Sequence, residues 1–133
     1  MPGAKEVVKG LKDKGYTVVC FSGGFRNATT FFAEILGLDV EFANFLHSKE
    51  GVLTGLVGGE MMFNDSKGQM LARLQKLLNV SVENTLVVGD GANDLSMFKH
   101  ASKRVAFCAK PILKNEANII IDKKDLTLIL NYI

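Results

Sequence analysis

The sequence carries little net charge. It has 16 Lys and Arg residues against 14 Asp and Glu residues, a formal balance of +2. With no basic run in the chain, this balance gives no support for nucleic acid or an anionic membrane as a partner. No apolar run approaches the roughly 20 residues that a helix needs to span a bilayer. The first ten residues, MPGAKEVVKG, are polar and helical and contain no apolar core of a secretory signal, so we expect a cytoplasmic protein.

Cysteine is also scarce, and the chain has no repeats or low-complexity tracts. The two cysteines, Cys20 and Cys108, lie in the apolar runs TVVCF and RVAFC, which favours buried reduced thiols over a disulfide framework. A length of 133 residues with 47% hydrophobic residues is ordinary for one globular domain that buries its own core. We therefore expect a single domain over residues 1–133.

Hydrophobic periodicity predicts strands that alternate with helices. Short runs rich in β-branched residues predict strands at Thr17–Phe21, Thr85–Gly89, Arg104–Cys108 and Asn118–Ile121. Spacings of three and four residues predict helices at Ala4–Lys14, about Phe25–Leu36, about Ser66–Leu78, near Asn93–His100, from Pro111 and from about Asp125. Such alternation is typical of an α/β fold with a parallel sheet flanked by helices.

The first strand and the second helix allow more detailed predictions, and residues 41–62 depart from the alternation of strands and helices. Thr17–Phe21 has the composition of a strand buried on both faces. The second helix has an apolar stripe of Phe25, Ala28, Phe32 and Ile35. Residues 41–62 alternate loosely between apolar and polar around Lys49-Glu50-Gly51, which predicts a β-hairpin.

Ligands of parallel sheets bind beyond the carboxyl ends of the strands, and two strand exits carry suitable residues. The first is Gly89-Asp90-Gly91-Ala92-Asn93-Asp94, where Asp90 follows a strand and Asp94 lies where a helix begins. Two carboxylates within one turn suit a hard cation such as Mg²⁺. The alternative is a plain turn in which Asp90 or Asn93 caps the helix.

The second strand exit is Ser22-Gly23-Gly24. Backbone N–H groups at the start of a helix favour an anion, and the serine hydroxyl adds a donor. Here the alternative is a serine N-cap with two turn glycines. A serine nucleophile is a third reading, but Ser22 lacks the G-x-S-x-G setting, and neither His47 nor His100 is a natural base for it.

Lys67 stands at the start of a predicted helix, where a cation opposes the helix dipole. This local disadvantage indicates another task, such as neutralising phosphate; the alternative is a solvated surface lysine. A carboxylate metal site, an anion site and a lysine near the strand ends together describe a pocket for phosphoryl transfer, which relies on positioning and charge neutralisation.

The runs VVCFSGGF, DSKG and VVGDGANDLSM, in this order and at these spacings, resemble the phosphoserine phosphatase family of the haloacid-dehalogenase superfamily. The resemblance covers essentially the whole chain and implies a Rossmann-like core. It implies that Ser22 and Gly23 hold the substrate phosphate, that Lys67 neutralises it and that Asp90 binds Mg²⁺. By the same resemblance, Asp94 holds Lys67 or a metal-bound water, and Asn93 hydrogen-bonds near the transferred group.

The chain departs from the family pattern in one large respect. The family's first motif, D-x-D-x-[TV], supplies the aspartate that attacks phosphorus and the aspartate that acts as general acid and base. Neither this motif nor the helical cap that follows it is present among these residues. By resemblance, the strand that ends in the first motif lies between Thr17–Phe21 and Thr85–Gly89. Without it, we expect two open apolar edges, and a chain that is unstable alone or is completed by a separate N-terminal segment, a swapped neighbour or rearranged strand pairing.

Our leading hypothesis is a Mg²⁺-dependent phosphomonoester hydrolase for L-phosphoserine that forms L-serine, as in serine biosynthesis, with the nucleophile outside this sequence. A related phosphatase for another small phosphate, such as a phosphosugar or phosphohomoserine, is the near alternative. A fragment that only binds Mg²⁺ and phosphate, or has no activity at all, is the non-enzymatic alternative. A receiver-like domain also uses an aspartate and Mg²⁺ but explains neither SGGF nor GDGAND.

Overall fold

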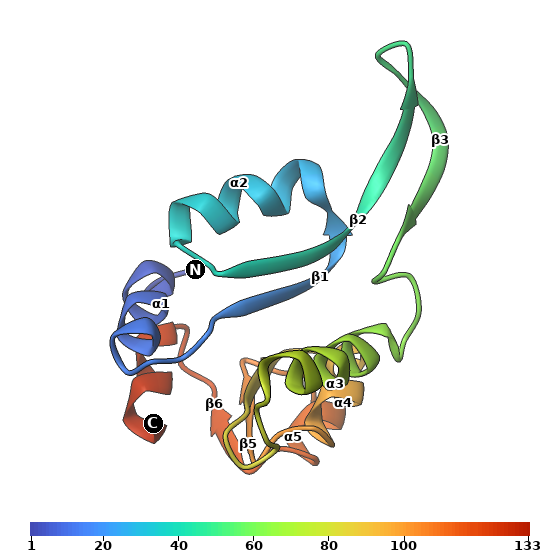
Figure 1. Cartoon of the computed structure of the whole chain (residues 1–133). Coiled ribbons are helices and arrows are strands. Elements are labelled where there is room, and N and C mark those ends of the chain that lie inside the picture. The colour runs from blue at the N-terminus through green and yellow to red at the C-terminus, as the bar shows by residue number, and fades with distance from the viewer. The chain divides into compact units, whose positions relative to one another are not determined.

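The structure is a computed structural model that describes residues 1–133, and its backbone contacts divide the chain into two compact units (Figure 1). We call Ala4–Phe63 the N-terminal unit. We call Asn64–Ile133, together with Met1–Gly3, the C-terminal unit. None of the helices is long and apolar enough to cross a membrane.

The N-terminal unit holds a mixed three-stranded sheet. In chain order its elements are α1 (Ala4–Asp13), β1 (Val19–Phe25), α2 (Arg26–Leu36), β2 (Val40–Lys49) and β3 (Val52–Gly59). β1 pairs in parallel with β2, and β2 pairs antiparallel with β3. β2 and β3 therefore form the predicted hairpin, which is the extended green ribbon of Figure 1.

The C-terminal unit holds a parallel three-stranded sheet in the order β4-β5-β6. Its elements are α3 (Ser66–Leu78), β4 (Leu86–Gly89), η1 (Ala92–Asp94), α4 (Leu95–Phe98), β5 (Lys103–Phe107), α5 (Pro111–Lys114), β6 (Ile119–Ile121) and η2 (Leu126–Tyr132). Val105 on β5 and Leu113 on α5 are fully buried and mark the centre of its core. The predicted α/β alternation with parallel strands is confirmed.

Several local predictions were wrong. The first strand does not end before Ser22; it continues through Ser22-Gly23-Gly24 to Phe25, because these residues stay extended beside β2. This strand is half-buried, not buried on both faces, since β1 is the end strand of its sheet. By contrast, the helix predicted from about Asp125 is present as a 3₁₀ helix from Leu126, and the Asp125 carboxylate caps it by accepting from Thr127 N.

The apolar stripe of α2 is not its more buried face. Phe32 and Ile35 are 56% and 48% exposed, and the half-buried positions are Thr29, Ala33 and Leu36 on another face. Thr29 is held there because its hydroxyl donates to the Glu41 carboxylate on β2. A polar anchor therefore sets the orientation of this helix, and the larger apolar stripe is left outside.

β1 and β4 are end strands of two different sheets. Each of them therefore leaves one side of its own sheet without a paired strand. The instability expected of such edges stays a prediction. Cys20 and Cys108 form no disulfide, as predicted, but are half-buried rather than buried.

Candidate active site

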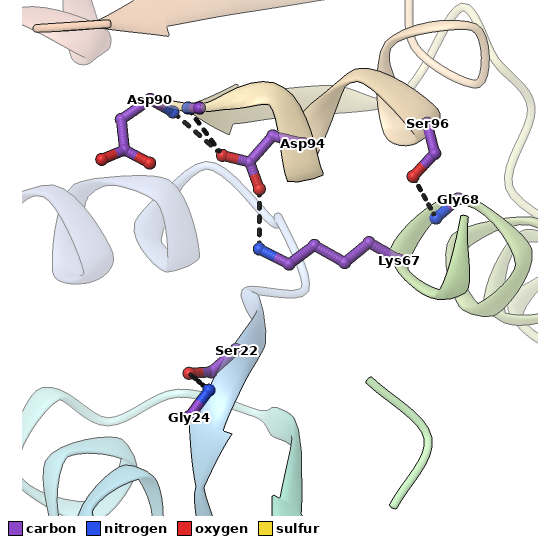
Figure 2. Close-up of polar contacts among 8 residues, drawn as sticks. Ser22, Gly24, Lys67, Gly68, Asp90, Asp94 and Ser96 are labelled. Atoms are coloured by element: carbon purple, nitrogen blue, oxygen red, sulfur yellow. Dashed lines mark hydrogen bonds and ion pairs between the residues drawn. The ribbon is translucent and has the colours of Figure 1, made fainter. Parts of the chain in front are cut away.

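The loop between β4 and α4 is organised by the side chain of Asp94. Its Oδ2 accepts hydrogen bonds from the backbone N–H groups of Asp90, at 3.0 Å, and Gly91, at 3.3 Å (Figure 2). Asp94 is buried, with 4% of its surface exposed. The helix-capping alternative assigned to Asp90 or Asn93 is therefore wrong, because the carboxylate that satisfies the loop amides belongs to Asp94.

The second oxygen of Asp94 binds Lys67. Lys67 Nζ donates to Asp94 Oδ1 at 2.7 Å, and the two side chains are only 10% and 6% exposed. The surface-lysine alternative is therefore wrong. A buried charge is tolerated only when it is paired, so this contact connects the start of α3 to the β4–α4 loop.

Two glycines allow this close packing. A Cβ added to Gly68 would lie 2.3 Å from the Ser96 backbone oxygen, and one added to Gly89 would lie 2.5 Å from Asp94 Cβ. Gly68 N also donates to Ser96 Oγ at 3.1 Å, as Figure 2 shows beside Lys67. Any side chain at these two positions would push apart the elements that carry Lys67 and Asp94.

Asp90 differs from Asp94 in having an available carboxylate. Its side chain is exposed and forms no hydrogen bond or ion pair within the structure, while its backbone oxygen accepts from Lys110 N at 2.9 Å. Asn93 is likewise exposed. No group of three His, Cys, Asp or Glu residues gathers into a ready metal cage. One free carboxylate still fits Mg²⁺, which keeps most of its waters and takes one or two protein carboxylates.

Ser22 and Gly23 lie in a bulge of β1 within the N-terminal unit. Phe21 pairs with Phe42 and Phe25 with Asn44, so the three residues between them on β1 face a single residue of β2. Ser22 Oγ accepts from Gly24 N at 3.0 Å (Figure 2) and does not cap α2, which begins only at Arg26. The serine N-cap alternative is therefore wrong, and the hydroxyl proton stays free to be donated.

Asn44 holds this bulge to the base of the hairpin. It is 4% exposed; its Nδ2 donates to Gly23 O at 3.1 Å, and its Oδ1 accepts from Met61 N at 3.0 Å. Sequence analysis missed Asn44 because one amide within a strand gives no periodic signal. It also missed Gly68, although a glycine inside a helix is costly and is itself a signal of close packing.

The histidines give no support to a serine nucleophile. His47 lies in the hairpin, where its Nδ1 is 2.8 Å from Thr54 Oγ1. His100 lies after α4 in the C-terminal unit, where burial, and then the nearby charge of Lys99, lower its pKa. Ser22 Oγ is meanwhile engaged with its own backbone, at Gly24 N.

Two similar proteins of other organisms carry the same name. The chain is 62% identical to a phosphoserine phosphatase of Wolinella succinogenes over 133 residues, which is all of this chain and 65% of that protein. It is 52% identical to a phosphoserine phosphatase of Methanocaldococcus jannaschii over 131 residues, which is 98% of this chain and 62% of that protein. The chain thus spans a little under two thirds of the length of these relatives.

The fold leads to the same group of proteins. A phosphoserine phosphatase in its apo form matches with a TM-score of 0.95 at 52% identity, over 99% of this chain and 66% of that one. A substrate-bound phosphoserine phosphatase complex matches with a TM-score of 0.94 at 52% identity, over 99% of this chain and 63% of that one. The family model of haloacid dehalogenase-like hydrolases matches residues 1–102. This chain therefore belongs to the haloacid dehalogenase-like hydrolase family.

Proposed function

We propose that this chain supplies phosphate-binding and Mg²⁺-binding groups of a phosphomonoester hydrolase that converts L-phosphoserine to L-serine and phosphate. The observation that carries the proposal is the buried contact between Lys67 and Asp94 beside the free carboxylate of Asp90. The relatives named phosphoserine phosphatase support the choice of substrate.

Lys67 is suited to neutralise the transferred phosphoryl group. An ammonium group has three N–H donors, and Asp94 Oδ1 takes one of them, so two remain for phosphate oxygens. Because Asp94 is itself fixed by two backbone amides, it holds Lys67 in one position. Such fixed charge stabilises a developing anion without reorganisation during the reaction. Asn93, exposed on the same loop, would add a hydrogen bond near the transferred group.

Asp90 would hold Mg²⁺, because its carboxylate is exposed and unpaired while both oxygens of Asp94 are engaged. The bound cation would supply charge neutralisation to the phosphoryl oxygens. In the N-terminal unit, the Ser22 hydroxyl and the Gly23 backbone would donate to phosphate, since the bulge keeps this segment out of regular pairing.

We further propose that the attacking aspartate comes from polypeptide outside these 133 residues. They contain no D-x-D-x-[TV] motif, and the relatives are longer by about a third of their length. The reaction would then pass through an aspartyl phosphate on that other segment, and this chain alone would be inactive. A separate N-terminal segment or a swapped neighbour would complete the sheet.

The test is phosphate release from L-phosphoserine by the purified chain with Mg²⁺, with and without an added polypeptide that carries the first motif and its helical cap. We expect release only in the complemented sample, and loss of that release in Asp90→Asn but not in Asp13→Asn, an exposed carboxylate on α1. Release by the chain alone would overturn the proposal, because the nucleophile would then lie within these residues.

The complemented sample also separates the alternative substrates. Faster release from another small phosphate, such as phosphohomoserine, would move the assignment to a related phosphatase. Binding of Mg²⁺ and phosphate without turnover of any substrate would assign the chain a binding role only.

A further inference from the structure

A pocket lies in the C-terminal unit, and it is not lined by the residues proposed for phosphate and metal binding. Its volume is about 440 Å³, and it is lined by Leu95, Phe98, Lys99, Arg104, Ile112, Asn115 and Glu116. These residues come from α4, β5, α5 and the turns after the two helices, which can be located in Figure 1. The volume is within the range of about 300–1,000 Å³ typical of small-molecule sites.

The pocket lies toward the opposite end of the sheet from Asp90. Leu86 pairs with Lys103 and Gly89 with Ala106, so Asp90 follows the carboxyl end of β4, while Arg104 is the second residue of β5. None of Lys67, Asp90, Asn93 and Asp94 lines the pocket. A ligand bound there would therefore not compete directly for those residues.

Arg104 is the unusual residue of the pocket. Its Nε is buried without a hydrogen-bond partner, and its guanidinium forms no ion pair within the structure. Buried polar groups are nearly always paired, so an arginine that lines a pocket without any side-chain hydrogen bond or ion pair to the chain indicates an acceptor that the chain itself does not provide.

The remaining lining defines the ligand further. Lys99 adds a second cation, also without an ion pair, and Glu116 adds one unpaired anion, so the lining carries a net positive charge. Leu95, Phe98 and Ile112 provide an apolar wall. A guanidinium presents parallel N–H groups that match the two oxygens of a carboxylate.

We propose that this pocket binds a small organic carboxylate with an apolar body. The carboxylate accepts hydrogen bonds from Arg104 and attraction from Lys99, and the apolar body covers Leu95, Phe98 and Ile112. Glu116 weakens the binding, because its charge has the same sign as that of the ligand.

The experiment is an NMR titration of the ¹⁵N-labelled 133-residue chain with 3-phenylpropionate, which combines one carboxylate with one phenyl ring. We expect saturable shifts at the amides around the pocket. Phenethylamine, with the same ring but a cationic end, should give none, and inorganic phosphate, without an apolar body, should bind more weakly. Equal binding of phenethylamine, or tighter binding of phosphate, measured at these same pocket amides, would overturn the proposal.

Charge variants separate binding from a loss of folding. Arg104→Gln should weaken binding by about tenfold, the size expected for a charged hydrogen bond. Glu116→Gln should strengthen it by about twofold, the size of one partly exposed charge interaction. Lys124→Gln removes one positive charge, as Arg104→Gln does, but at an exposed residue outside the pocket. It should leave the affinity unchanged. A gain in Glu116→Gln cannot come from misfolding, so its absence, with equal affinities in all variants, would refute the assignment.

Discussion

Lys67 Nζ lies 2.7 Å from Asp94 Oδ1, and both side chains are at least nine-tenths buried. Removal of one partner leaves a buried charge without compensation. We therefore expect Asp94→Asn to lower the free energy of unfolding by about 3–5 kcal/mol. The amide also replaces one of the two carboxylate oxygens with a donor, which would face either Lys67 or the amides of Asp90 and Gly91. Urea unfolding followed by circular dichroism measures the loss.

The matched control is Asp13→Asn, which breaks the exposed pair of Lys9 and Asp13. These side chains are 76% and 61% exposed, so the change should be no more than a few tenths of a kcal/mol. Equal losses in the two variants would show that burial does not set the strength of the Lys67–Asp94 contact.

Gly68→Ala should destabilise the chain, because it overpacks the contact between α3 and the β4–α4 loop. The new Cβ would meet the Ser96 backbone oxygen at 2.3 Å, and a backbone atom cannot move aside as a flexible side chain can. We expect a loss of about 1–3 kcal/mol, the usual cost of overpacking, although alanine favours helix. Gly23→Ala is the control, because its Cβ would meet nothing within 4 Å. If Gly68→Ala were more stable than Gly23→Ala in urea unfolding, α3 would not pack against the Ser96 backbone as closely as described.

Asn44→Ala tests the anchor of the β1 bulge. It removes the hydrogen bonds to Gly23 O and Met61 N, two backbone groups that Asn44 satisfies. We expect a loss of about 2 kcal/mol, at about 1 kcal/mol for each bond. Hydrogen exchange at the Met61 amide should accelerate more than exchange elsewhere in β2. Asn27→Ala, at an exposed residue of α2, should change neither quantity, and unchanged exchange at Met61 in Asn44→Ala would contradict the anchoring role.

Asp39 makes the stability of the N-terminal unit depend on pH. Hydrogen bonds from the Lys12 ammonium and, to a lesser extent, from Val18 N hold the pKa of Asp39 below its ordinary value of 3.8. A lowered carboxyl pKa adds stability above that ordinary value, and the stability is lost as the pH falls through the folded-state pKa. Wild type should therefore exceed Asp39→Asn in unfolding free energy near neutral pH, by no more than about 1 kcal/mol because both side chains are partly exposed. The difference should shrink as the pH falls below 3.8, and a difference that stays constant over this fall would refute the linkage.

The order of elements could be predicted from the sequence because each strand and helix has its own period. The two strand exits and Lys67 could be identified because local structure alone does not require these residue types at those positions. A lysine at the start of a helix, for example, opposes the helix dipole. The contacts of each group could not be derived from spacing, and the contact between Asp94 and Lys67 was expected only from the family resemblance. Whether Asp90 or Asp94 satisfies the loop amides depends on backbone angles four residues apart, which no spacing encodes.

Contacts between residues far apart in the sequence also explain why β1 and α2 differ from what their local patterns predict. Glycines after a strand predict a turn, but in β1 they form a bulge, because Asn44 binds Gly23 O from the neighbouring strand. In α2 the larger apolar stripe predicts the buried face, but the hydrogen bond from Thr29 to Glu41 fixes a different one. In both cases one long-range polar contact overrides the local pattern.

The exposed hairpin should make this chain self-associate. β3 is an end strand of its sheet, and Val52, Leu53 and Leu56 on it are 68%, 62% and 66% exposed. An apolar end strand pairs readily with other strands, and one lysine there is a common protection. We expect the weight-average mass in sedimentation to rise with concentration for the wild-type chain and to rise less for Leu56→Lys. Asn27→Lys adds the same charge on α2 and should behave as wild type; equal suppression by both variants would mean that net charge, and not the edge of β3, controls the association.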